Sequence, residues 1–135
     1  MTTHSGSCQC GGVSFTLTNP SPGIACHCGK CRKTTGAAFI VATTVPGDSG
    51  DITLADGVTL QEFASSPYLT RRRCSRCGAT VLNAVKLKDR AFDNYMVTLL
   101  DDPSAIELSH HIYYADRVVD VSDDRPKFDA WGRPG

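Results

Sequence analysis

The stretch that decides the fold is Cys26-His27-Cys28-Gly29-Lys30-Cys31 (CHCGKC), which places three cysteines within six residues. Four more cysteines lie in two pairs, CQC at residues 8–10 and CSRC at residues 74–77. Seven is an odd number, and the first ten residues, MTTHSGSCQC, contain no apolar segment of a secretory signal. We therefore expect reduced thiols in the cytoplasm, where clustered thiolates usually bind metal, rather than a disulfide framework.

The spacing divides the seven cysteines into a group of four and a group of three. An i, i+2 pair on an extended strand points both thiols to one face, and a CxxCG turn does the same across a tight bend. Two such pairs close a tetrahedral structural zinc site, whereas three ligands leave a position open, as in a catalytic zinc. The predicted ligands are Cys8, Cys10, Cys74 and Cys77 at the structural site, and Cys26, Cys28 and Cys31 at the catalytic site, which gives two Zn²⁺ per chain.

Three other interpretations of CHCGKC stay open at this point. A distant histidine could complete a second structural zinc, because structural sites are usually four-coordinate. The three thiols could form a disulfide relay, although that chemistry expects a βαβ context that is not visible here. An iron–sulfur cluster is the third, although the spacing matches no ferredoxin pattern.

The remainder of the chain has a mainly β pattern with little helix. Val13, Phe15 and Leu17 alternate with polar residues, as in a half-buried strand. Further strands are predicted at residues 38–42, 59–63, 80–85, 95–100 and 106–114, a turn at 46–51, and helical turns only at 30–35 and 91–94. Without a repeat or a long amphipathic helix, residues 1–135 are expected to form one domain, with an irregular tail from about Ser122.

Charge and hydropathy argue against two classes of partner. Fourteen basic and fourteen acidic residues give a net charge of zero, which does not favour nucleic acid. No run of about 18 apolar residues exists, so no membrane span is expected. The basic run Arg71–Arg73, with Arg76, flanks the four-cysteine group, whose negative charge explains it.

Three motifs, in this order, resemble the glutathione-dependent formaldehyde-activating enzyme family, which includes centromere protein V. They are GSCQCG at residues 6–11, CHCGKCRKTTG at residues 26–36 and CSRCG at residues 74–78, and the similarity extends to about His111-Ile112. The resemblance implies small coiled β-sheets organised around zinc, with the two metal sites on the two cysteine groups named above. It also implies the condensation of formaldehyde with glutathione to S-hydroxymethylglutathione, whose reversal is a carbon–sulfur lyase reaction.

Polar side chains near the open site are candidates for catalysis and substrate binding. His27 lies between two ligands, and His111 matches the family's His-Ile, so both are candidate catalytic residues. Lys30, Arg32 and Lys33 could balance the charge of the site or bind a substrate carboxylate.

The strand at residues 106–114 contains two histidines of opposite parity. His110 shares its face with Ile106, Leu108 and Ile112, and we expect it to be buried and hydrogen-bonded. His111 points with the polar residues of the same strand.

Together these features predict a zinc-dependent carbon–sulfur lyase-type enzyme that acts on a small thiol such as glutathione or its aldehyde adduct. The alternative is a non-catalytic, zinc-stabilised scaffold for protein contacts. An open zinc that accepts a thiol favours the enzyme, and two zincs with four protein ligands each favour the scaffold. The oligomeric state is left open.

Overall fold

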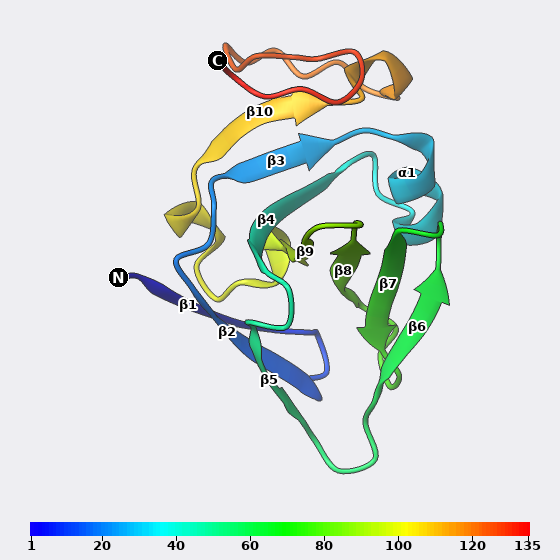
Figure 1. The fold of residues 1–135 in the computed structure, drawn as a ribbon. Helices are drawn as coiled ribbons and strands as arrows, with labels where there is room; N and C mark the ends of the chain where they lie inside the picture. The colour runs from blue at the N-terminus through cyan, green and yellow to red at the C-terminus, as the bar shows by residue number, and fades with distance from the viewer.

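The computed structural model describes all 135 residues and contains two β-sheets (Figure 1). The smaller sheet has the strand order β1-β2-β5, and the larger has the order β10-β3-β4-β9-β8-β7-β6. The bounds are β1 (Thr3–Ser7), β2 (Val13–Thr18), β3 (Gly23–Cys26), β4 (Ile40–Pro46), β5 (Asp51–Leu54), β6 (Leu60–Ala64), β7 (Leu69–Cys74), β8 (Thr80–Lys86), β9 (Ala91–Met96) and β10 (Leu108–Ile112). Strands hold 42% of the residues and helices 12%, so the prediction of a mainly β fold of small sheets is confirmed.

Helical structure is limited to short elements. The α-helix is α1 (Gly29–Thr35), and the 3-10 turns are η1 (Val97–Leu99), η2 (Pro103–Ala105) and η3 (Tyr114–Asp116). Cys28 caps the start of α1, where its sulfur accepts the Cys31 N–H, and Gly36, with a φ of 76°, caps the end. None of these helices is long and apolar enough to cross a lipid bilayer.

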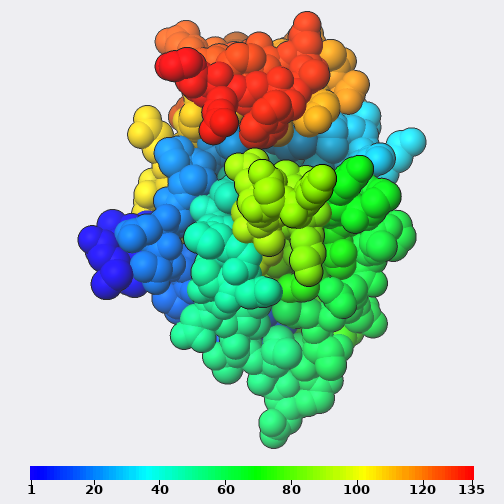
Figure 2. All heavy atoms as spheres, in the orientation of Figure 1, coloured from blue at the N-terminus to red at the C-terminus, as the bar shows by residue number.

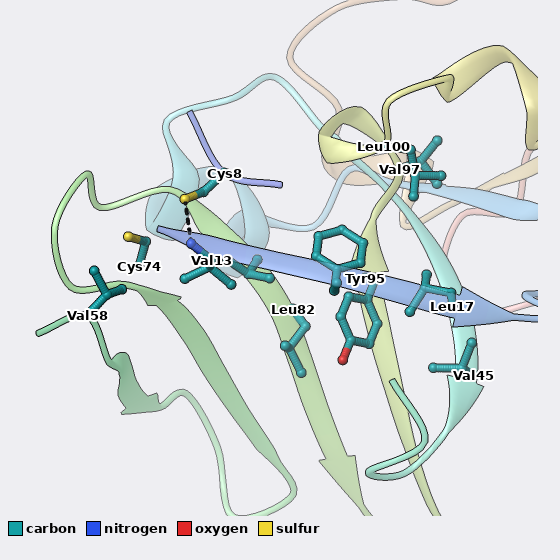
Figure 3. Packing of buried hydrophobic residues seen from close by; sticks show 12 residues of the cluster. Cys8, Val13, Leu17, Val45, Val58, Cys74, Leu82, Tyr95, Val97 and Leu100 are labelled. Carbon is teal, nitrogen blue, oxygen red and sulfur yellow. Dashed lines mark hydrogen bonds between the residues drawn. The ribbon is translucent and has the colours of Figure 1, made fainter. Parts of the chain in front are cut away.

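The core lies between the small sheet and the middle of the large one (Figure 3). Val13, Phe15 and Leu17 alternate inward along β2, as their spacing predicts, and each is buried. The Phe15 ring packs against that of Tyr95, with 4.9 Å between their centroids. Cys8 and Cys74 belong to the same apolar cluster and lie at one end of it, so one cysteine group is built into the edge of the core.

Residues 91–100 differ from the prediction. Residues 91–94 form the start of β9 rather than a helical turn. The strand predicted at residues 95–100 extends only to Met96, the end of β9, because η1 begins at Val97. Asp93 is a poor strand former, but its buried carboxylate accepts the Asp48 N–H at 3.0 Å across the sheet. The tertiary contact therefore outweighs the local preference of this segment.

The arginine run at residues 71–73 forms part of β7, which was not predicted as a strand. Because side chains alternate along a strand, Arg71 and Arg73 point to one face and Arg72 to the other. Arg72 pairs with Glu62 of the neighbouring strand β6 at 3.0 Å. The run thus divides between two environments instead of forming one basic patch.

The C-terminal tail lies along β10 and covers it (Figures 1 and 2). Residues 122–135 contain no helix or strand of their own apart from an isolated bridge between Lys127 and His111. His111 donates its N–H to Pro126, and Phe128 donates its N–H to His111. These bonds place the tail along the free edge of β10, and Asp123 of the tail contacts the His111 ring, which is 0% exposed.

Candidate functional site

The four-cysteine group joins the turn after β1 to the turn after β7. The sulfurs of Cys8, Cys10, Cys74 and Cys77 all lie within 4.8 Å of one another. The Cys8–Cys10 sulfurs are 3.6 Å apart and the Cys10–Cys74 sulfurs 3.7 Å apart. A tetrahedral ion with zinc–sulfur bonds of about 2.3 Å separates its ligands by about 3.8 Å, so the spacing fits zinc.

Backbone N–H groups and one arginine surround these sulfurs. Cys8 accepts the Val13 N–H at 3.3 Å, and Cys74 accepts the Arg76 N–H at 3.4 Å. The Arg76 guanidinium donates to Cys10 at 3.4 Å and lowers the pKa of that thiol to about 6. These donors stabilise thiolates, which is the protonation state that metal ligation requires.

The three-cysteine group lies where β3 passes into α1. Cys26 ends the strand, Cys28 caps the helix and Cys31 lies on the buried face of its first turn. Their sulfurs lie within 4.8 Å of one another, with 3.7 Å between Cys26 and Cys31. Hydrogen bonds from the Cys26 and Cys31 thiols lower the pKa of Cys28, and the hydrogen bonds of Cys26 with Cys28 and Cys31 raise the pKa of Cys26.

No histidine nitrogen or carboxylate belongs to this second group. A structural site with a fourth ligand from a distant histidine is therefore not supported. Cys26 and Cys28 are half-buried, and Cys31 is buried. The protein therefore supplies three thiols, and no other ligand atom, to this group.

Arg71 contacts the three-cysteine group. The sequence pattern had placed it beside the four-cysteine group instead. Arg71 is 3% exposed, and its Nη1 donates to the Cys31 sulfur at 3.7 Å. Its Nε has no hydrogen-bond partner. A buried guanidinium needs a negative partner, and the thiolates supply it.

The two candidate catalytic histidines lie together in the interior. His27 and His111 are each 0% exposed, and the His27 Nε2 lies 2.9 Å from the His111 Nδ1. The His27 ring stacks on Phe39, with 4.5 Å between centroids, and meets the edge of Tyr114. His111 thus lies beside the cysteine segment because β10 pairs with β3.

Asp123 of the tail completes this line of polar groups. The His111 Nε2 lies 2.9 Å from an Asp123 carboxylate oxygen. Lys127 and Arg125 contact the same carboxylate at 2.7 and 3.0 Å. The hydrogen bond from His111 and these two cations hold the pKa of Asp123 well below its usual range. His110 lies apart and is bound to the Gly132 carbonyl at 2.9 Å, as the buried interpretation predicted.

The candidate substrate-binding residues are divided by the structure. Lys30 and Lys33 line a groove of about 530 Å³, together with Thr34 of α1, Phe63, Ser65 and Arg73. Arg73 donates to Thr34 at 3.3 Å and so joins β7 to the helix. Arg32 is half-buried and does not line the groove.

The sequence pattern placed Arg71 and Arg73 beside the four-cysteine group, and it gave no indication of Phe63 or Asp123. A strand assignment for residues 69–74 would have separated Arg71 and Arg73 from Arg72, because alternation places these two on one face. The place of Asp123 depends on how the tail folds, for which the sequence carries no periodic signal.

Comparison with known families gives one model that matches most of the chain. The model is described as "Glutathione-dependent formaldehyde-activating enzyme" and matches residues 3–116. That range includes both cysteine groups and both histidines of the buried line, and it ends before the tail.

Several fungal proteins that are provisionally named glutathione-dependent formaldehyde-activating enzymes are similar to this chain. One from Aspergillus terreus is 32% identical over 82 residues, which are 58% of this chain and 42% of that protein. One from Phaeosphaeria nodorum is 35% identical over 79 residues, 58% of this chain and 41% of that protein. One from Fusarium vanettenii is 27% identical over 128 residues, 91% of this chain and 68% of that protein. The first two matches therefore span less than half of the relative's length.

A solved structure shares the fold. The crystal structure of a Rhodobacter sphaeroides protein superimposes with a TM-score of 0.53 at 19% identity, covering 92% of this chain and 98% of that one. The similarity concerns the arrangement of strands alone.

Proposed function

Because this chain belongs to the glutathione-dependent formaldehyde-activating enzyme family, we propose that it is a zinc-dependent enzyme that makes or breaks the carbon–sulfur bond between a small thiol and an aldehyde. The observation that carries the proposal is a group of three thiols with no fourth protein ligand. Glutathione and formaldehyde, which the relatives' names specify, are the substrates to test first. In the reverse, lyase direction the substrate is S-hydroxymethylglutathione.

The two cysteine groups take different roles in this proposal. The four-cysteine group holds a structural zinc and stabilises the fold, because four thiolates close its coordination. The three-cysteine group holds the catalytic zinc, which when bound keeps a substrate thiol deprotonated beside the aldehyde. The scaffold interpretation has no comparable observation in its favour.

The reaction balances without any other reactant. The substrate sulfur, having lost its proton, attacks the carbonyl carbon, and a carbon–sulfur bond forms as the carbonyl π pair moves to oxygen. That oxygen takes up one proton, so thiol and aldehyde become the hydroxymethyl adduct. In the reverse direction the hydroxyl proton leaves, the carbonyl reforms and the sulfur departs as a thiolate.

The chain's own charges favour an anionic thiol. Three thiolates and Zn²⁺ carry a net charge of −1, and a bound thiolate makes this −2, so nearby cations stabilise the complex. Arg71 touches Cys31 from the buried side. On the outside, Lys30, Lys33 and Arg73 line a groove that shares α1 and β7 with the site. We assign this groove to the carboxylates of the substrate, with Phe63 as its apolar wall.

Calorimetry on the zinc-loaded protein tests the open position. Glutathione should displace a proton when it binds, so the measured enthalpy should change with the ionisation enthalpy of the buffer. S-methylglutathione lacks the thiol proton and keeps the rest of the molecule, and it should bind much more weakly. Equal binding of the two would reject thiol activation and favour the scaffold.

The activity itself is measured by exchange spectroscopy with ¹³C-labelled formaldehyde. The protein should accelerate interconversion of the thiol and its hydroxymethyl adduct, and Cys28→Ser should abolish the acceleration. Lys33→Gln should weaken glutathione binding about twofold to fivefold, the range of an exposed ion pair, while Lys88→Gln, at an exposed lysine that does not line the groove, should not. Weakening by both lysine variants alike would show that only net charge matters.

A further inference from the structure

A continuous line of polar groups, in which both histidines are buried and Asp123 is partly exposed, connects the tail to the cysteine segment. Asp123 contacts the His111 Nε2 at 2.9 Å, and the His111 Nδ1 contacts the His27 Nε2 at 2.9 Å. The three residues come from the tail, from β10 and from the loop after β3. Nothing in the proposed reaction uses Asp123, although it is the one charged group in the line.

We propose that Asp123 is a positioning residue, which acts through His111 to hold His27 in one orientation and one tautomer and so fixes the backbone between the metal ligands Cys26 and Cys28. This proposal rests on the proposed function only in treating Cys26, Cys28 and Cys31 as a metal site. It requires no particular substrate.

The direction of each hydrogen bond follows from the end of the line. The Asp123 carboxylate can only accept, so the His111 Nε2 donates to it. A neutral imidazole has one donor and one acceptor, so the His111 Nδ1 accepts and the His27 Nε2 donates. The His27 Nδ1 is then left with a free lone pair, and in the structure this atom is buried with no hydrogen-bond partner.

Asp123 does not need a charged histidine as its partner. Its carboxylate is already paired with Lys127 at 2.7 Å and Arg125 at 3.0 Å. Both rings are 0% exposed, and an N–H donor on a neutral His111 ring is enough to complete the line.

Packing transmits this orientation to the cysteine segment. The His27 ring is held between Phe39 and the edge of Tyr114, so it cannot turn without moving them. Its backbone N–H donates to the Ile112 carbonyl at 3.1 Å. The ring and the backbone of His27 are thus both attached to β10. The ring is also connected to the tail, through His111 and Asp123.

The test measures ring tautomers directly in the zinc-loaded protein. Long-range ¹⁵N–¹H correlation spectra should show His27 and His111 both neutral and protonated at Nε2. Asp123→Ala removes the terminal acceptor, so the two rings should lose this single tautomer. Asp124→Asn is the matched control, because Asp124 is the adjacent exposed carboxylate and has no side-chain hydrogen bond to either ring. It should leave the spectra unchanged.

A second readout is the rate at which a chelator removes zinc from the three-cysteine site. Loss of a hydrogen-bonding partner outside the ligand shell typically weakens metal binding 10–100-fold, so Asp123→Ala should release zinc about tenfold faster than Asp124→Asn, and Asp123→Glu should restore part of the difference. A wild-type spectrum with His27 protonated at Nδ1, or equal tautomers and release rates in both variants, would overturn the proposal. The wild-type spectrum decides even if Asp123→Ala does not fold. Failure of glutathione to bind leaves this test intact, so the two proposals fail separately.

Discussion

Cys77→Ser should destabilise the protein strongly although the thiol it removes is exposed. Cys8 and Cys74 belong to the core, so substituting either one would also disturb packing. Cys77 lies outside the core and is exposed, so serine there costs little by itself. The loss of stability at this position therefore reports the loss of the metal.

The size of the effect follows from the length of chain that the cluster closes. Cys10 and Cys74 are 64 positions apart, and their sulfurs are 3.7 Å apart. The chain-entropy relation gives about 4 kcal/mol for closing such a loop, a large share of the 5–15 kcal/mol that is typical of a whole domain. For a chain of this size, that loss corresponds to a midpoint lowered by roughly 10–20 °C.

Thermal unfolding of wild type and variant, followed by far-ultraviolet circular dichroism under reducing conditions, measures this shift. The fluorescence of Trp131 is less suitable, because that residue is 59% exposed in the tail. Metal content of the same samples should be two zinc ions per chain for the wild type and one for Cys77→Ser. A chelator should destabilise the wild type at least as much as the substitution does.

Cys28→Ser is the matched control. It also removes one thiol, but its group spans only six residues, for which the same relation gives about half the loop-closure term. Serine is itself a good helix cap, so α1 keeps the cap that the Cys28 sulfur now provides. If Cys28→Ser lowered the midpoint more than Cys77→Ser, or if Cys77→Ser kept both ions and an unchanged midpoint, the roles assigned to the two groups would be wrong.

Three further substitutions test other parts of the structure. Arg71→Met should weaken glutathione binding to the zinc-loaded protein in calorimetry, because it removes the buried cation beside Cys31 that offsets the added charge of a bound thiolate, whereas Arg71→Lys should lose less. Asp93→Asn should raise the denaturant midpoint at pH 7, because burial raises the pKa of this carboxyl. Ionisation of Asp93 therefore opposes folding, and the gain should vanish as the pH falls below the ordinary pKa of aspartate, about 3.9. Gly50→Ala should cost about 1–3 kcal/mol in chemical denaturation, since the new methyl group would overlap the buried Tyr95 hydroxyl; an unchanged midpoint would contradict the packing described.

The sequence by itself determined the features that depend on local spacing. The division of the cysteines into four and three is such a feature, because an i, i+2 pair, a CxxCG turn and the CHCGKC segment each gather their sulfurs within a few residues, and the structure groups the same residues. The inward alternation of Val13, Phe15 and Leu17 is another, since a strand repeats every two residues.

The tertiary structure alone decided which distant groups meet. Local pattern assigned Arg71 to the wrong cysteine group, because only the pairing of β7 in the large sheet aims its side chain at Cys31. The parity of β10 placed His111 on a polar face, but its ring lies in an interior where it contacts His27 and Asp123 of the tail. These contacts join residues 84 and 12 positions apart. Periodicity describes which face a residue occupies, whereas what lies against that face depends on strand order and on the path of an irregular segment.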